Sequence, residues 1–150
     1  MSSSIEAVVT SAASLAKIVK LVDGFVPKVK DLNNTPNSIE QGDNPQVFFH
    51  PRANKAQRLT FDGPNATHHA RRDFTVITYF IDTMEMVPVW ASRVRTTTWC
   101  DAFVEAVNGS DSLGIDDCYV EANAEVRDGL EFNKQQFRGA IITLTGWFFT

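Results

Sequence analysis

Residues 118–127 alternate between apolar and polar side chains more regularly than any other part of this 150-residue chain. The apolar positions of this segment are Cys118, Val120, Ala122, Ala124 and Val126. Because successive side chains of a β-strand point to opposite faces, a period of two predicts a strand with one face against a core. The chain therefore contains a β-sheet, and the polar positions of this strand face water or another subunit.

Two long runs are also typical of strands. The even positions of 74–80 form one apolar face, and their odd neighbours form a second, so this segment is expected to be a central strand covered on both sides. A last strand is expected at about 137–149, with Asp128-Gly129 as the turn before it. Shorter β-type runs are expected at 47–49 and 58–61.

Two segments have helical patterns. Ser3 and Glu6 have the spacing of a capping box, and apolar residues then recur at helical spacing, which predicts a helix over about residues 4–23. A second helix is expected from Pro88 to Asn108-Gly109. Residues 31–46 are rich in Asn, Asp, Pro and Gly and are expected to form a long loop.

This order of elements defines the expected fold class. The length fits one domain, residues 1–150. Segregated strands and helices predict an α+β fold: a mainly antiparallel sheet with two helices packed on one face.

The charges are distributed unevenly along the chain. The net charge of −4 argues against a protein whose main task is to grip nucleic acid. Five basic residues and one acidic residue lie between residues 52 and 72, whereas nine acidic residues and one basic residue lie between 101 and 131. The chain therefore has a positive and a negative segment, which is what a head-to-tail contact between copies needs. Simple exposure of both segments to water is the alternative.

Residue types that carry chemistry do not form a known catalytic or metal-binding pattern. Adjacent strand residues point to opposite faces, so His68 and His69 are expected at a solvated strand end rather than around a metal ion. Cys100 falls on the patterned helix and is expected to be packed. Glu121 and Glu125 would be roughly 13 Å apart along one strand, beyond the spacing of paired catalytic carboxylates. No enzymatic activity, metal or cofactor is expected.

The two cysteines and the absence of a secretory signal pattern predict synthesis in a reducing, intracellular compartment. No apolar run is long enough to predict a membrane span.

The order of elements resembles the tail-terminator and tail-completion proteins in the neck of tailed bacteriophages. Those chains begin with a helix, pass through early strands into a long strand such as RRDFTVITYFID, and insert one helix such as PVWASRVRTTTWCDAFVEAV. They close on a hairpin, here CYVEANAEVRDGLEF with FRGAIITLTGWFFT. The resemblance covers nearly the whole chain and rests on the order of elements, without a specific linear motif.

The resemblance implies a virion structural protein, assembled in the host cytoplasm, that forms a homo-hexameric ring on the tail tube. Its partners would be the tail tube protein, a head-completion or connector protein, and a sheath protein if the tail contracts. Genomic DNA would only pass through the lumen, and no membrane would be involved. The residues expected at contacts between subunits are Arg52, Lys55, Arg58, His68, His69, Arg71, Arg72, Asp116, Asp117, Glu121 and Glu125.

Two alternatives remain open at this point. One is another phage neck, connector or tube-associated protein, which the order of elements does not separate from a terminator. The other is a small α+β ligand-binding or enzymatic domain, with a pocket between helix and sheet lined by some of His50, His68, His69 and Tyr79.

Overall fold

The described part of the chain forms two helices and one five-stranded sheet in the computed structural model. It covers residues 5–19, 27–30, 45–58, 70–82, 89–110, 112–132 and 135–149, and it describes the backbone alone at 52–58, 70, 89–92, 128, 132, 135 and 136. The elements are α1 (Ile5–Ile18), β1 (Lys28–Lys30), β2 (Gln46–Arg58), β3 (Ala70–Asp82), α2 (Val89–Ser110), β4 (Cys118–Phe132) and β5 (Gln135–Phe149).

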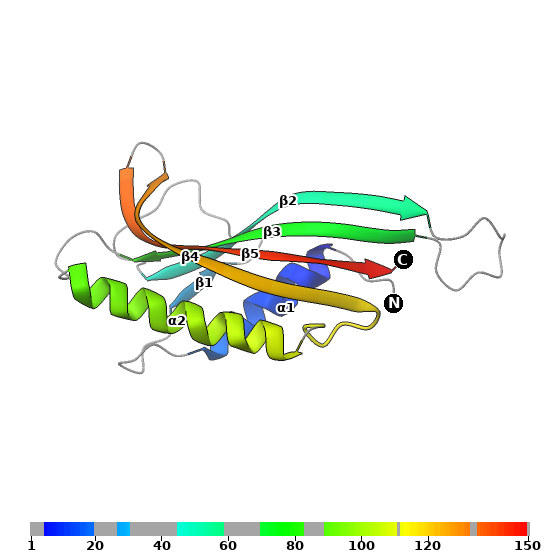
Figure 1. The fold of residues 1–150 in the computed structure, drawn as a ribbon, viewed down its shortest axis with the longest axis horizontal. Coiled ribbons are helices and arrows are strands. Elements are labelled where there is room, and N and C mark those ends of the chain that lie inside the picture. The colour runs from blue at the N-terminus through cyan, green and yellow to red at the C-terminus, as the bar shows by residue number, and fades with distance from the viewer. Residues whose placement is uncertain are drawn as a thin grey trace.

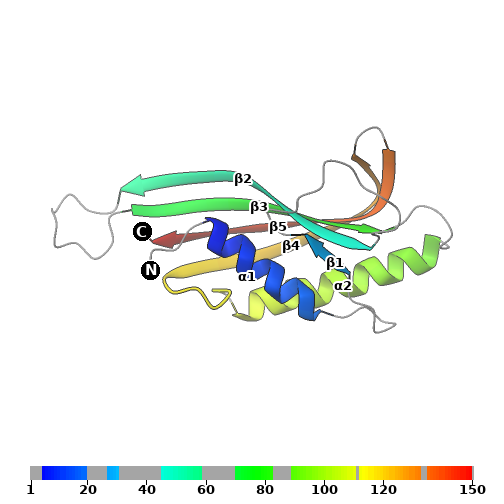
Figure 2. The same cartoon turned by 180° about the vertical axis from the view of Figure 1, so that it is seen from behind.

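The strands lie in the order β1-β2-β3-β5-β4. β1 runs parallel to β2, and the other three pairs are antiparallel. Both views of the fold place α1 and α2 on the same side of this sheet (Figures 1 and 2). The predicted α+β class, with a mainly antiparallel sheet, helices on one face and residues 74–81 in its central strand, is confirmed.

The main core lies between the helices and one face of the sheet. It holds apolar side chains from β2 to β5 together with the buried faces of α1 and α2. Trp99 of α2 is fully buried and stacks between Phe80 of β3 and Phe103, with ring centroids 4.9 Å apart in each pair. Its indole N–H donates to the carbonyl oxygen of Val19 at 3.3 Å, so one side chain joins the sheet and the chain just after α1.

Small residues let α1 approach this core closely. Its buried face consists of Val8, Val9, Ala12, Ala13 and Ala16, at the helical spacing that the sequence predicts. The helix ends at residue 18 rather than near 23, and residues 20–26 lie outside the described part. Among the described residues, neither helix has the length and apolarity to cross a membrane.

Strand β2 differs from its prediction. The structure has one strand from Gln46 to Arg58 instead of two short runs, so Gln46 belongs to the strand and not to the loop before it. The register with β3 shifts between Pro51 and Ala53. A proline and a bulge in the middle of the segment hide the period of two, and both are tolerated because this part of β2 is at the margin of the sheet. Residues 59–61 lie outside the described part.

The turn predicted at Asp128-Gly129 is wrong. β4 continues to Phe132, and the dipeptide lies where the register with β5 shifts between Arg127 and Leu130. A bulge increases the local twist and bends the strand. Accordingly, the end of the β4–β5 hairpin curves away from the helices in both views (Figures 1 and 2).

This curved hairpin builds a second, smaller core on the face of the sheet that the helices leave uncovered. Leu130 and Phe137 of the hairpin are buried there with Phe48 and Ile81. Tyr79 packs against the cluster and stacks on Phe48 at 5.1 Å. The second face of β3 is therefore covered at its Ile81 end only, which corrects the expectation of cover along the whole strand.

Candidate functional site

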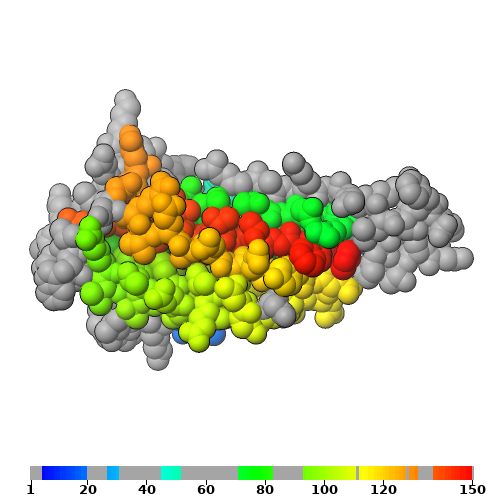
Figure 3. All heavy atoms as spheres, in the orientation of Figure 1, coloured from blue at the N-terminus to red at the C-terminus, as the bar shows by residue number. Residues whose placement is uncertain are grey.

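In the described structure, the helices leave one face of the sheet uncovered. We call it the open face. Its side chains beyond the hairpin cluster are half-buried or exposed, and atoms of β3, β5 and β4 reach the surface side by side without a helix over them (Figure 3). They are His50, Arg71, Asp73, Thr75, Ile77, Tyr119, Glu121, Asn123, Glu125, Thr143, Thr145 and Trp147.

An aromatic and charged cluster occupies one end of the open face. Tyr119 and Trp147 are partners in the β4–β5 register, and their rings stack at 4.5 Å. The guanidinium carbon of Arg71 lies 4.4 Å from the centre of the Trp147 ring, and its Nε donates to Asp73 at 2.9 Å. Such cation–π contacts and ion pairs hold a long side chain in place. Arg71 is therefore engaged within its own chain.

Arg71 and Arg72 lie on opposite faces of the sheet. Because they are neighbours on β3, Arg71 is on the open face, and Arg72 is at the level of Phe148, whose side chain belongs to the main core. Both arginines are half-buried. The two predicted interface residues thus face different layers of the molecule.

An acidic row follows β4 along the open face. Glu121 and Glu125 are exposed on the same side of the strand, as predicted. Glu125 forms an ion pair with Arg127 at 3.2 Å, whereas Glu121 accepts a hydrogen bond from the Tyr119 hydroxyl at 3.3 Å. Beside Glu121 lies a shallow trough of about 460 Å³, lined by Glu121, Ala122, Asn123, Thr143 and Thr145.

Part of the predicted basic segment and part of the predicted acidic segment lie toward opposite margins of the sheet. Arg52, Lys55 and Arg58 belong to β2, and the acidic row belongs to β4 at the other margin. Asp116 and Asp117 are exposed in the turn before β4, at the end of the sheet that carries Arg71. His68 and His69 lie outside the described residues.

The two margins of the sheet differ in their backbone contacts. Among the described residues, β1 pairs only with Gln46–Phe48, and no strand pairs with the rest of β2 on that side. At the other margin, the Asn108 side chain of α2 satisfies the backbone of Ala122: its Oδ1 accepts from the amide N–H at 2.8 Å and its Nδ2 donates to the carbonyl at 3.3 Å. The predicted helix end at Asn108-Gly109 thus also covers part of the β4 margin.

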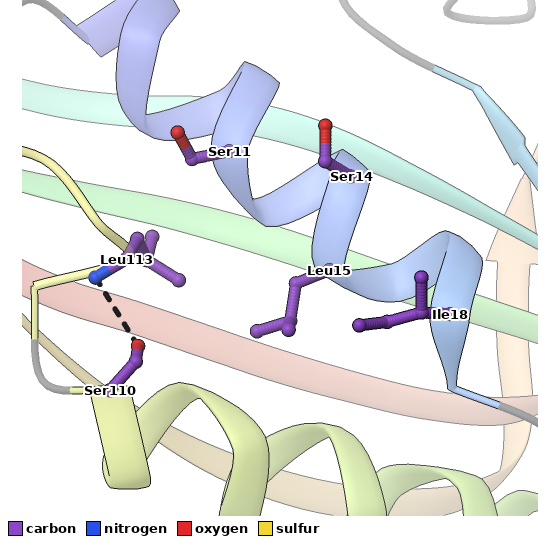
Figure 4. Close-up of a pocket in the computed structure, with 6 residues that line it drawn as sticks. All are labelled: Ser11, Ser14, Leu15, Ile18, Ser110 and Leu113. Carbon is purple, nitrogen blue, oxygen red and sulfur yellow. Dashed lines mark hydrogen bonds between the residues drawn. The ribbon is translucent and has the colours of Figure 1, made fainter.

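A second pocket lies on the helix side. It has a volume of about 280 Å³ and is lined by Ser11, Ser14, Leu15, Ile18, Ser110 and Leu113. In Figure 4, Leu15 and Ile18 project from α1 into the space that Leu113 borders on the other side. Ser14 donates to the Thr10 carbonyl, and Ser110 accepts from the Leu113 amide, so these hydroxyls serve the local backbone. The lining residues that the structure describes carry hydroxyl and apolar side chains, and none of them is ionisable.

The pocket considered for a ligand-binding or enzymatic domain is not formed as expected. His50 and Tyr79 lie on the open face, whereas the helices cover the opposite face. Strand alternation is the reason, since Phe49 and Phe80 occupy the positions that face the helices. His68 and His69 cannot be placed against this pocket because they are outside the described part.

Metal-binding and thiol chemistry find little support in the described residues. Within them, no group of three or more His, Cys, Asp and Glu side chains is arranged to hold a metal ion. Cys100 is buried on α2, as predicted, and burial, followed by the nearby charge of Asp101, raises its thiol pKa to about 12. Burial also raises the pKa of Cys118 to about 11. Thiolates are the reactive form, so neither cysteine is activated.

We expect thiol-specific labelling at pH 8 to follow this order of burial. Cys118 is half-buried and should react slowly in the folded protein, and Cys100 should react only after unfolding. Mass spectrometry of iodoacetamide-treated protein, with and without denaturant, measures both sites. Equal rates for both thiols in the native protein would contradict the packing of α2.

Because folding favours the protonated thiols, their contribution to stability should be present below about pH 9 and decline as the pH rises above it.

The fold and the open face define an α+β protein with one helix-covered sheet face and one uncovered face that is aromatic at one end and acidic along β4. No protein-family model matches the sequence, and no curated protein matches it.

Sequence patterns did not predict the contacts of Tyr119, Trp147 or Asn108. Tyr119 and Trp147 meet only through the β4–β5 register, which no pattern within either strand specifies. The Asn-Gly dipeptide signals a helix end, but its contact with Ala122 depends on how α2 packs beside β4.

Proposed function

We propose that this chain is a virion structural protein: a tail terminator whose copies form a ring that caps the tail tube and joins it to the head-side neck. The observation that carries the proposal is the open face, bordered by a basic strand at one margin and an acidic strand at the other. The order of elements, which resembles that of tail terminators, is its second support.

An uncovered sheet face is costly to expose when it carries large side chains. Beyond the hairpin cluster, the described part of this face presents Ile77, Tyr119 and Trp147 among threonines and charges, and neither helix covers them. Burying apolar area releases about 25 cal/mol per Å², so a neighbouring subunit over part of this face would gain free energy. Its mixed polarity is typical of an assembly surface rather than of a core.

Opposite charges at opposite margins favour a head-to-tail contact. In such a contact, one patch of a subunit meets a different patch of the next, and a rotation that closes generates a ring. Complementary charges also steer the approach of the subunits and fix their register. The proposed ring would stack on the tail tube, contact a head-completion or connector protein on its other side and leave a lumen for DNA.

The test is the assembly state of the purified protein. We expect closed rings, six copies in each, in native mass spectrometry and negative-stain electron microscopy, either from the protein alone or after addition of purified tail tubes. A folded monomer that neither associates with itself nor binds tail tubes at any concentration would rule the proposal out. Rings that bind a connector but not the tail tube would assign the chain to another neck component.

A further inference from the structure

We propose that the trough between β4 and β5 on the open face receives a basic side chain from β2 of a neighbouring copy, with Glu121 as its carboxylate partner. This inference rests on the proposed ring and names the contact that closes it. The contact lies on the open face beside the β4 margin. The proposed occupant of the trough is a second copy of this chain.

The trough has the lining that a cationic side chain needs. Glu121 is exposed at its border and supplies a carboxylate, while Asn123, Thr143 and Thr145 supply neutral oxygen atoms. Lysine and arginine side chains are donors without acceptors, so oxygen-rich lining suits them. The volume of about 460 Å³ leaves room for such a side chain without movement of the strands.

Glu121 is the acid of this row whose charge is not paired in the described structure. Glu125, four residues further along β4, already forms an ion pair with Arg127 at 3.2 Å. Arg71, at the same end of the open face as Glu121, is held by Asp73 at 2.9 Å. Among the described side chains, no cation pairs with Glu121, and its partner is the neutral Tyr119 hydroxyl. The Glu121 carboxylate is therefore open to an ion pair with a basic side chain of another molecule.

Strand β2 has the matching charge. Its 13 residues include Arg52, Lys55 and Arg58 and no acidic residue. It lies toward the opposite margin of the sheet from β4, so a neighbour placed side by side brings its β2 toward this trough.

The register also places the two elements at similar heights. Lys55 is opposite Asp73, Asp73 is opposite Trp147, and Trp147 is opposite Tyr119, which forms one row across the sheet. Glu121 is two residues beyond Tyr119, about 7 Å along β4. If neighbouring copies of the ring stand side by side at the same height, a lysine or arginine of the neighbour's β2 would need to span that offset along the strand to meet Glu121.

Charge reversal tests this contact. One variant carries Glu121→Lys, and a second carries Arg52→Glu, Lys55→Glu and Arg58→Glu together. Each is expected to associate with itself at least about 10-fold more weakly than the unchanged protein, because like charges meet at the contact. An equal mixture of the two variants should restore ring formation, because every contact then pairs opposite charges. Analytical ultracentrifugation measures association, and circular dichroism checks that each variant is folded.

Glu105→Lys is the matched control. Glu105 is exposed on α2, so the substitution makes the same change of charge on the helix side and should leave assembly unchanged. If the triple variant does not fold, Lys55→Glu alone replaces it in the mixing experiment.

The outcomes separate this contact from the ring itself. Rings of the Glu121→Lys variant as stable as those of the unchanged protein would overturn the contact and leave the proposed function standing. If the Glu121→Lys variant and the β2 variant are both folded and fail to assemble even when mixed, the pairing with β2 is overturned. An unchanged protein that never assembles, alone or on tail tubes, would overturn the proposed function and this contact together.

Discussion

Replacing Gly146 with alanine is expected to destabilise the protein by about 3 kcal/mol or more. A Cβ atom at this position would lie 1.8 Å from the carbonyl oxygen of Tyr119 and 2.8 Å from its carbonyl carbon. These are backbone atoms of the adjacent strand β4, so no side chain can rotate away and the strands must separate. The strain falls on the β4–β5 pair, next to the stacked rings of Tyr119 and Trp147.

Urea-induced unfolding measures this effect. Gly129→Ala is the matched control, because a Cβ atom there meets no atom within 4 Å. We expect the control to change the free energy of unfolding by less than about 1 kcal/mol. A Gly146→Ala protein as stable as the control would show that β4 and β5 do not approach as closely as described.

Replacing Trp99 with alanine is expected to cost about 3–5 kcal/mol. The indole is fully buried, stacks on Phe80 and Phe103, and donates a hydrogen bond to Val19. Alanine would leave a cavity between α2 and β3 and an unsatisfied carbonyl near the end of α1. The layer of helices would thus lose its main anchor to the central strand.

Two further variants divide this cost. Trp99→Phe should retain part of the stacking, lose the hydrogen bond and cost less than alanine. Val94→Ala, at a position that is 51% exposed on the same helix, should be within about 0.5 kcal/mol of the unchanged protein. Thermal unfolding followed by near-ultraviolet circular dichroism reports both stability and the environment of the aromatic side chains. A Trp99→Ala protein no less stable than Val94→Ala would contradict the described core.

Much of the fold follows from periodicity in the sequence. The alternation after Cys118 and the apolar faces of 74–80 and 137–149 correctly predict strands, because one face of each must be buried continuously. The helical spacing of α1 predicts its buried residues for the same reason. These signals are local and strong.

Other features depend on contacts between distant segments. The odd positions of β3 include the apolar Ile77 and Ile81 and the aromatic Tyr79, yet only Ile81 among them is fully buried, because both helices pack on the other face. Periodicity indicates which residues share a face of a strand, but it does not predict which of the two faces the helices pack against. Similarly, the bulges at Arg52 and before Leu130 are invisible to a pattern that assumes uninterrupted alternation.

The candidate site shows the same division. The sequence predicts the acidic row of Glu121 and Glu125 from a single strand, and the structure keeps both residues exposed on one side. It did not predict that Arg71 would be held over Trp147, since that contact joins β3 to β5. Engagement of Arg71 within its own chain leaves β2 as the better source of positive charge for a neighbour.

The contact between Asn108 and Ala122 has a consequence for how copies can join. A strand with unbonded amides and carbonyls is a template for addition of further strands, and repeated addition leads to fibres of unlimited length. Here a side-chain amide already bonds one of those backbone positions, Ala122 of β4, at 2.8 and 3.3 Å. Growth of one continuous sheet through this margin is blocked at Ala122, so subunits that meet beside β4 must recognise each other by their side chains, a mode of association that can end in a finite particle.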